Sequence, residues 1–321
     1  MSVRFDIITV AILRNKGRKI ERESIMKKLL LFIIIVVFVF TACKSSGGGD
    51  SDSGPAGDGS PAGQENTQEY TPENTQVTER ILFEKDKVKT TLLSLEPGLD
   101  SPLGPEFKIL VENGSEQSIT LQTKDSSVNG IMIGTWLSCE VPPGEKVNDS
   151  ITFLMPELEI SGIEIIKEVE LKLVVIDTAS LNPLFSTDTI TIATSAENYV
   201  QSCDDSGTIA LDRDGIKIVT KKLDDQDSLW GADVFVYIEN NSGADVIVQA
   251  RNVLVNGFTI DPWFSCDVLG GKKAFSTISF METDLEAYGI SKISEIELKF
   301  VVIDRNSFDT ISEGDIVKLA F

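Results

Sequence analysis

The sequence predicts an all-β protein built from a duplicated domain, and three observations carry this prediction. Residues 105–177 repeat at 232–304 without a gap. Each copy consists of short runs of β-branched and aromatic residues separated by turn residues, which is the pattern of strands and hairpins. Hydrophobic residues make up 41% of the 321 residues, a share that suits folded domains, and the length accommodates about two of them.

The internal repeat decides the predicted architecture. At a constant offset of 127 positions, 29 of the 73 aligned residue pairs are identical. Identical segments include 112–113 with 239–240, 128–130 with 255–257, 170–172 with 297–299, and 174–177 with 301–304. A duplicated domain with the same strand order in both copies follows from this match.

The first elements of each copy are strands joined by turns. β-rich runs at 107–111 and 234–238 end in Asn-x-Ser, whose side chains favour turns. The next strands begin at 119 and 246. They run to Asn-Gly pairs at 129–130 and 256–257, which predict tight hairpins because both residues tolerate positive φ.

The later elements complete a sandwich. Each copy is expected to contain a strand, one helical turn, a long strand and a last strand: 151–153, 158–163, 168–177 and 187–193 in the first, and 278–280, 285–290, 295–304 and 315–320 in the second. Six or seven short strands in about 115 residues are typical of an immunoglobulin-like β-sandwich.

The N-terminal segment predicts export. Lys27 and Lys28 precede an unbroken apolar run of 12 residues, 29–40, and Thr41-Ala42-Cys43 follows. A basic start, a short apolar stretch and small residues before a cleavage site describe a secretory signal. The apolar run is too short to span a membrane comfortably, which takes about 20 residues.

Residues 40–43, Phe-Thr-Ala-Cys, resemble the lipobox of bacterial lipoproteins. In that family the cysteine thiol receives a diacylglyceryl group, and cleavage makes the cysteine the new N-terminus. The resemblance implies lipidation of Cys43 and a protein that is held at the cell membrane by this lipid and faces the extracytoplasmic side. The alternative is an ordinary signal peptide whose cysteine is incidental.

The remaining N-terminal residues divide into two parts. Met26 directly precedes the basic residues of the signal, so we expect translation to begin there. Between residues 44 and 76 the only large apolar residue is Tyr70, and such a composition predicts a disordered tether. The expected organisation is a mis-start segment (1–25), signal peptide (26–42), tether (43–78), first sandwich (79–197), junction (198–205) and second sandwich (206–321).

Charge and composition exclude several functions. The chain has 29 basic and 50 acidic residues, a net charge of −21, which argues against nucleic-acid binding because phosphate contacts need a basic surface. The sequence contains no histidine, which removes histidine-dependent catalysis and histidine-ligated metal sites. We therefore expect no cofactor, no metal site and no enzymatic activity.

The turn motifs carry a second resemblance. Strands that end in Asn-x-Ser, Val-Asn-Gly hairpins and the Pro-Gly-x-Lys turn at 143–146, behind a lipoprotein signal, resemble the Ig-like modules of bacterial surface lipoproteins. Many of those proteins belong to Gram-positive gut bacteria. The resemblance covers residues 26–321 and implies anchoring and fold, but no activity.

Strand alternation assigns the duplicated Trp and Cys residues to opposite faces. Cys139 and Cys266 fall on the apolar side and are expected to be buried thiols. Trp136 and Trp263 then point outward and are candidates for a surface that binds a sugar ring or a protein partner. The alternatives are tryptophans that cover the end of the sandwich or a domain contact, and a disulfide from Cys203 to one of the buried cysteines.

Acidic residues crowd the start of the second copy, at Asp212, Asp214, Asp224, Asp225 and Asp227. Oxygen-rich loops can hold calcium, but solvated surface charge is the favoured interpretation. The sequence as a whole predicts a lipid-anchored, non-catalytic binding or accessory protein of the cell envelope with an unknown protein or glycan ligand. The alternatives are a structural spacer and a carbohydrate-active enzyme with an Asp/Glu site.

Overall fold

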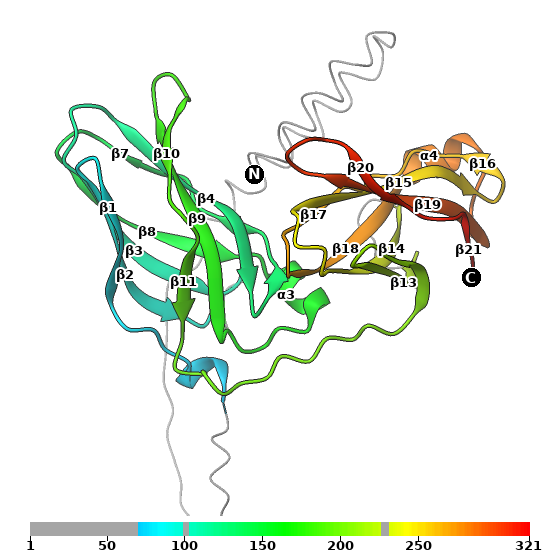
Figure 1. Ribbon diagram of the computed structural model, residues 1–321, viewed down its shortest axis with the longest axis horizontal. Coiled ribbons are helices and arrows are strands. Elements are labelled where there is room, and N and C mark those ends of the chain that lie inside the picture. Colours follow the sequence, from blue (N-terminus) through cyan, green and yellow to red (C-terminus); the bar gives the residue numbers. More distant parts are fainter. Residues whose placement is uncertain (1–69, 99–102, 226–230) are drawn as a thin grey trace, which may run out of the picture. The chain divides into compact units, whose positions relative to one another are not determined.

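The computed structural model describes residues 70–98, 103–225 and 231–321 (Figure 1). These residues form strands with two short helices, α3 (Met155–Ser161) and α4 (Glu282–Ala287), and one 3-10 turn, η2 (Pro72–Asn74). The all-β prediction is confirmed. The signal segment, Cys43 and most of the tether lie outside the described residues. Within the described part, no helix is long and apolar enough to cross a membrane.

The first repeat folds into two facing sheets (Figure 1). Its strands are β1 (Arg80–Lys85), β2 (Val88–Glu96), β3 (Glu106–Asn113), β4 (Ile119–Val128), β5 (Ile131–Met132), β6 (Thr135–Trp136), β7 (Cys139–Val141), β8 (Lys146–Phe153), β9 (Glu168–Asp177), β10 (Pro183–Ser186) and β11 (Ile190–Ala193). One sheet has the order β1-β2-β3-β8-β6, and the other contains β10-β9-β4 with β7 and β11. The sheet with β2, β3 and β8 faces the sheet with β4, β9 and β10. An immunoglobulin sandwich divides its strands in the same way, with A, B and E facing C, F and G.

The second repeat has the same order of elements. Its strands are β12 (Thr208–Arg213), β13 (Ile216–Asp224), β14 (Gly231–Asn240), β15 (Val246–Val255), β16 (Phe258–Thr259), β17 (Cys266–Val268), β18 (Lys273–Met281), β19 (Glu295–Asp304), β20 (Thr310–Glu313) and β21 (Val317–Ala320). The run β18-β14-β13-β12 forms one layer, which continues through β5 into the β10-β9-β4 sheet of the first repeat. The other layer is the sheet β16-β15-β19-β20, with β17 and β21.

Each repeat has its own hydrophobic cluster. In β3 and β9 every second side chain is buried, so one face of each strand packs into the core. Phe107 and Phe153 meet edge to face in the first cluster, with ring centroids 5.1 Å apart. Residues 68–321 nevertheless form one compact unit, and the number of domains stays a prediction.

The predicted Asn-Gly hairpins are confirmed. Asn129 and Gly130 have φ values of 53° and 81°, and Asn256 and Gly257 have 50° and 84°. The side-chain oxygen of Asn129 accepts hydrogen bonds from the backbone N–H groups of Lys167 and Glu168, at 2.9 and 3.1 Å. Asparagine therefore sets the turn and also ties it to the start of the neighbouring long strand.

The Asn-x-Ser motifs have a structural cause. Asn240 is fully buried, and its Nδ2 donates to the carbonyl oxygens of Ala244 and Val268, at 2.8 and 2.9 Å. Its Oδ1 accepts from the backbone N–H and the hydroxyl of Ser242, at 3.0 and 2.7 Å. Asn113 makes the equivalent bonds in the first repeat. Each asparagine satisfies backbone groups that the turn would otherwise leave buried without partners.

The helical turns were predicted three residues too late. They begin at Met155 and Glu282, not at 158 and 285, and Gly162 ends the first in the left-handed conformation at φ 63°. Pro156 favours the earlier start because its fixed φ suits the first helical turn. Glycine ends the helix because it adopts positive φ without steric cost.

The edge strands and part of the tether were also missed. The stretches predicted as single last strands are preceded by β10 and β20, and the hairpins β1–β2 and β12–β13 extend the repeat upstream. Residues 70–78 were assigned to the disordered tether, but Thr75 is buried, and Val77 packs against the first cluster. Gln76 exchanges hydrogen bonds with Ser195. The packed chain therefore begins before residue 79.

Contacts join the two repeats within the compact unit. Strand β18 pairs with β5 through Lys273 and Ile131, and the Lys273 N–H donates to the Gly130 carbonyl at 3.0 Å. The Arg305 guanidinium pairs with Asp125, at 2.8 Å, and Lys272 pairs with Glu170. Burial acts to raise the pKa of Asp125, but the hydrogen bond and charge of Arg305, with Lys172, outweigh it and hold this pKa below its ordinary value.

Candidate functional site

The two candidate tryptophans lie on the surface, as predicted. Trp136 is 52% exposed in β6, which pairs with β8 at Thr152. Trp263 is 59% exposed and exchanges two backbone hydrogen bonds with Ser279 of β18, at 2.8 and 3.1 Å. Backbone pairing therefore holds Trp136 to β8 and Trp263 to the equivalent strand, β18, the latter through an isolated bridge outside the named strands. About half of each side chain is available to a ligand.

The cysteines take the predicted positions on the opposite face. Cys139 and Cys266 are buried, Cys203 is half-buried, and none of the three forms a disulfide within the described residues. Burial, with the nearby charge of Asp149 as a smaller cause, raises the pKa of Cys139 to about 12. A thiol that stays protonated and enclosed is unreactive.

Thiol labelling tests this placement. With Cys43 replaced by Ser, native protein is expected to react with a maleimide at Cys203, whereas Cys139 and Cys266 should react only after denaturation. Intact-mass and peptide mass spectrometry measure the sites. Cys203→Ser serves as the control and should abolish the native reaction. Native labelling of Cys139 at the rate of Cys203 would contradict the burial.

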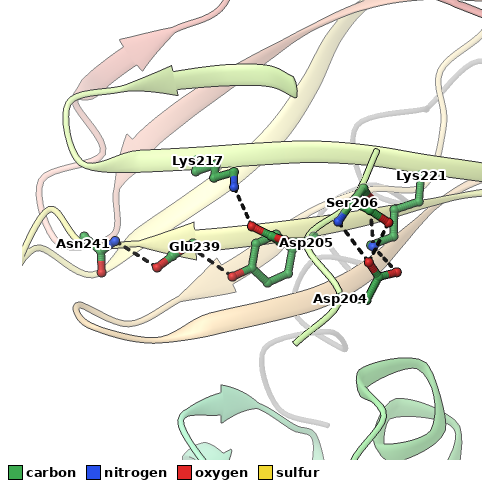
Figure 2. A network of polar contacts seen from close by, with 8 residues as sticks. Asp204, Asp205, Ser206, Lys217, Lys221, Glu239 and Asn241 are labelled. Carbon is green, nitrogen blue, oxygen red and sulfur yellow. Dashed lines mark hydrogen bonds and ion pairs between the residues drawn. The ribbon is translucent and has the colours of Figure 1, made fainter. Parts of the chain in front are cut away.

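A network of polar contacts lies where the junction meets the second repeat (Figure 2). Asp204 pairs with Lys221 at 2.8 Å, and Asp205 pairs with Lys217 at 2.7 Å, both lysines coming from β13. Lys221 also donates to the Ser206 carbonyl oxygen at 3.0 Å. These bonds fasten the junction onto the strand.

The lowered pKa values of the two aspartates in this network indicate a structural role. The hydrogen bond from Lys221, with those from Ser206, lowers the pKa of Asp204 far below its ordinary value, and Lys217 lowers the pKa of Asp205 in the same way. The Ser206 hydroxyl donates to the Asp204 carboxylate at 2.6 Å. A hydroxyl hydrogen-bonded to a carboxylate is also the arrangement of a nucleophile next to its general base. A general base works best with a pKa near the operating pH, so this carboxylate is poorly suited to activating the hydroxyl.

The junction is expected to detach in acid. A carboxyl whose pKa is lowered by folding stabilises the folded arrangement above its unfolded pKa, about 3.9, and this stabilisation is lost as the pH falls through the folded value. The Ser206 amide donates to the Asp204 carboxylate at 3.0 Å. Its protection factor, measured against the intrinsic exchange rate at each pH, should therefore hold down to about pH 4 and fall progressively below it.

Lysine variants give the matched test of this attachment. Lys221→Met should raise exchange at Ser206 at neutral pH, whereas Lys222→Met is the control because Lys222 stacks on the Phe235 ring. Equal exchange in both variants would contradict the attachment.

The acidic residues considered for calcium do not gather. Asp212 and Asp214 lie at the β12–β13 turn, whereas Asp224 and Asp225 lie at the other end of β13, about 25 Å away along the strand. Asp227 falls outside the described residues. Across 70–98, 103–225 and 231–321, no group of three or more acidic or cysteine side chains is arranged to hold a metal ion.

Sequence analysis missed a second aromatic surface. Phe258 and Tyr288 are 46% and 50% exposed, and their ring centroids lie 5.3 Å apart at an angle of 33°. They occupy the positions of Ile131 and Ser161, both buried in the first repeat. The signal in the sequence was the replacement of an aliphatic and a small residue by two aromatics.

No protein-family model matches the chain, and no curated protein matches it. Among solved structures, the YadV chaperone is 9% identical over 67% of this chain and 92% of its own, with a TM-score of 0.22. The CsuC-CsuE chaperone–tip adhesion subunit complex of Acinetobacter baumannii is 13% identical over 66% and 90%, at 0.20. A Porphyromonas gingivalis W83 protein of unknown function is 13% identical over 68% and 91%, at 0.18. Scores this low carry no functional argument.

Proposed function

We propose that the chain is a lipid-anchored, extracytoplasmic binding or accessory protein of the bacterial cell envelope and has no catalytic role. The lipobox-like residues before Cys43 support the anchor. The net charge of −21 supports a solvated surface that avoids anionic partners. The packed part of the chain, which is all-β, would then be the part that this anchor holds at the cell surface.

The observation that carries the binding role is the paired exposure of tryptophan. Trp136 and Trp263 stand at the same place in both repeats and leave 52% and 59% of their surface in water. Large aromatic side chains supply much of the binding energy when a ligand covers them. Keeping two of them exposed at equivalent positions suits a contact surface for a sugar ring or a protein.

The double variant Trp136→Ala/Trp263→Ala tests this role. The mature chain should give a signal on a glycan array or bind an envelope protein, and the double variant should lose at least tenfold in affinity. The matched control is Ile81→Ala/Ile209→Ala, which removes exposed side chains at equivalent positions of β1 and β12. A ligand bound equally by both variants would overturn the tryptophan surface, and a wild-type chain without any ligand would favour the structural spacer.

A further inference from the structure

One end of the first repeat is covered by the second. Ile131 at the tip of the β4–β5 hairpin is fully buried and pairs with Lys273 of β18. Phe275, two residues farther along β18, packs against the first repeat's hydrophobic cluster. Lys272 and Arg305 add ion pairs to Glu170 and Asp125. The cover is thus a basic turn followed by an aromatic side chain.

The second repeat keeps the shape of that covered end. Asp125 and Asn252 are equivalent, and both have positive φ, 55° and 53°, in a bulge at the same place of β4 and β15. The Asn-Gly hairpin and the short helix also recur, as β15–β16 and α4. Both repeats therefore build the same backbone shape from hairpin, bulge and helix, but an amide, Asn252, stands where the Asp125 carboxylate pairs with Arg305.

In the second repeat this surface is exposed and aromatic. Phe258 replaces Ile131 and is 46% exposed, and Tyr288 replaces Ser161 and is 50% exposed. Apolar residues scattered singly over a surface need no explanation, whereas a contiguous exposed apolar area can mark an interaction site. The rings of Phe258 and Tyr288, tilted against each other, form such an exposed apolar area. The residues at the equivalent positions of the first repeat are buried.

The negative charge beside the Phe258–Tyr288 pair indicates the chemistry of the partner that would cover it. The exposed helix α4 carries Glu282, Asp284 and Glu286 and has no basic residue in its last turn. We propose that the Phe258–Tyr288 surface binds a partner β-sandwich whose end presents a basic turn and an aromatic side chain, as Lys272, Lys273 and Phe275 do for the first repeat. The proposal concerns other residues than the two tryptophans, and its test does not depend on their role.

A second copy of this chain is the wrong partner chemically. The free end of the first repeat, which would have to serve as the cover, carries Glu145, Asn148 and Thr178 where the second repeat has Lys272, Phe275 and Arg305. Of the residues that make the internal contact, only the equivalent of Lys273 remains there, as Lys146, and its side chain pairs with Glu112. The net charge of −21 adds repulsion between copies.

A peptide with the sequence of residues 269–277, Leu-Gly-Gly-Lys-Lys-Ala-Phe-Ser-Thr, is the probe. Titrated into the ¹⁵N-labelled full chain, it should shift the amide signals of Gly257, Phe258 and Tyr288, with a Kd of about 1 mM. Phe258→Ala/Tyr288→Ala should weaken binding at least tenfold and leave the melting temperature unchanged. Ile209→Ala, which removes another exposed side chain, should bind as the parent chain does.

Three results would overturn the proposal. Equally tight binding of a peptide with both lysines changed to glutamate would remove the charge argument. Shifts confined to Gly130 and Ile131 would mean that the peptide only displaces the internal contact. Concentration-dependent dimers that Phe258→Ala abolishes, seen by sedimentation, would assign the surface to a second copy.

Discussion

Replacing Cys43 by alanine is expected to move the protein from the detergent phase entirely into the aqueous phase. Each buried methylene of an acyl chain contributes about 0.8 kcal/mol, and two chains anchor a protein stably where one gives only marginal binding. Without the thiol there is no site for the diacylglyceryl group, so the intact mass should also lack the lipid. Phase partitioning and mass spectrometry measure both effects.

The control for this experiment is Cys203→Ala, which removes a thiol from the packed part of the chain. It should partition and carry lipid as the parent protein does. If Cys43→Ala stays in the detergent phase with no change in mass, the anchor is wrong. The extracytoplasmic placement would then rest on the signal segment alone.

Replacing Asn240 by alanine is expected to lower the free energy of unfolding by about 3 kcal/mol. The change removes the hydrogen bonds that the Asn240 side chain makes to the Ala244 and Val268 carbonyl groups and to the Ser242 N–H, and leaves Ala244 only the weaker bond from the Ser242 hydroxyl. Buried backbone groups without partners cost about 1–3 kcal/mol each, and part of this is recovered where water can enter. Urea unfolding followed by tryptophan fluorescence measures the loss.

Asn241→Ala is the matched control, one residue along the same turn. Asn241 is exposed and bonds the Glu239 carboxylate at 3.1 Å, so its loss should change stability by less than about 0.5 kcal/mol. Equal effects of the two variants would mean that the buried hydrogen bonds contribute little. The motif would then be a turn preference and no more.

Local chemistry explains why much of the fold was predictable. Glu168–Asp177 and Glu295–Asp304 have the predicted ends because alternation and terminal aspartates mark them within one segment. The Asn-Gly turns were predictable because positive φ is a property of those two residues. The strands β10 and β20 were missed because they are short edge strands with little burial and no periodic pattern.

In the candidate site, too, some features were predictable from neighbouring residues and others were not. Trp136 and Cys139 lie three residues apart on two short strands that follow each other along the chain. Alternation of side chains was therefore enough to assign Trp136 to the outside and Cys139 to the inside. The ion pairs of Asp204 with Lys221 and of Asp125 with Arg305 join residues 17 and 180 positions apart. Nothing within a short window marks either pair.

The sequence by itself determined the duplication, the all-β class, the turn positions and the faces of the duplicated Trp and Cys residues, because each depends on neighbours along the chain. Only the tertiary structure decided which surfaces are covered. Ile131 is buried and Phe258 is exposed at equivalent positions, because the first has β18 packed against it and the second has no such strand in the described chain. Burial at a surface position depends on what packs there, and that contact joins residues distant in sequence.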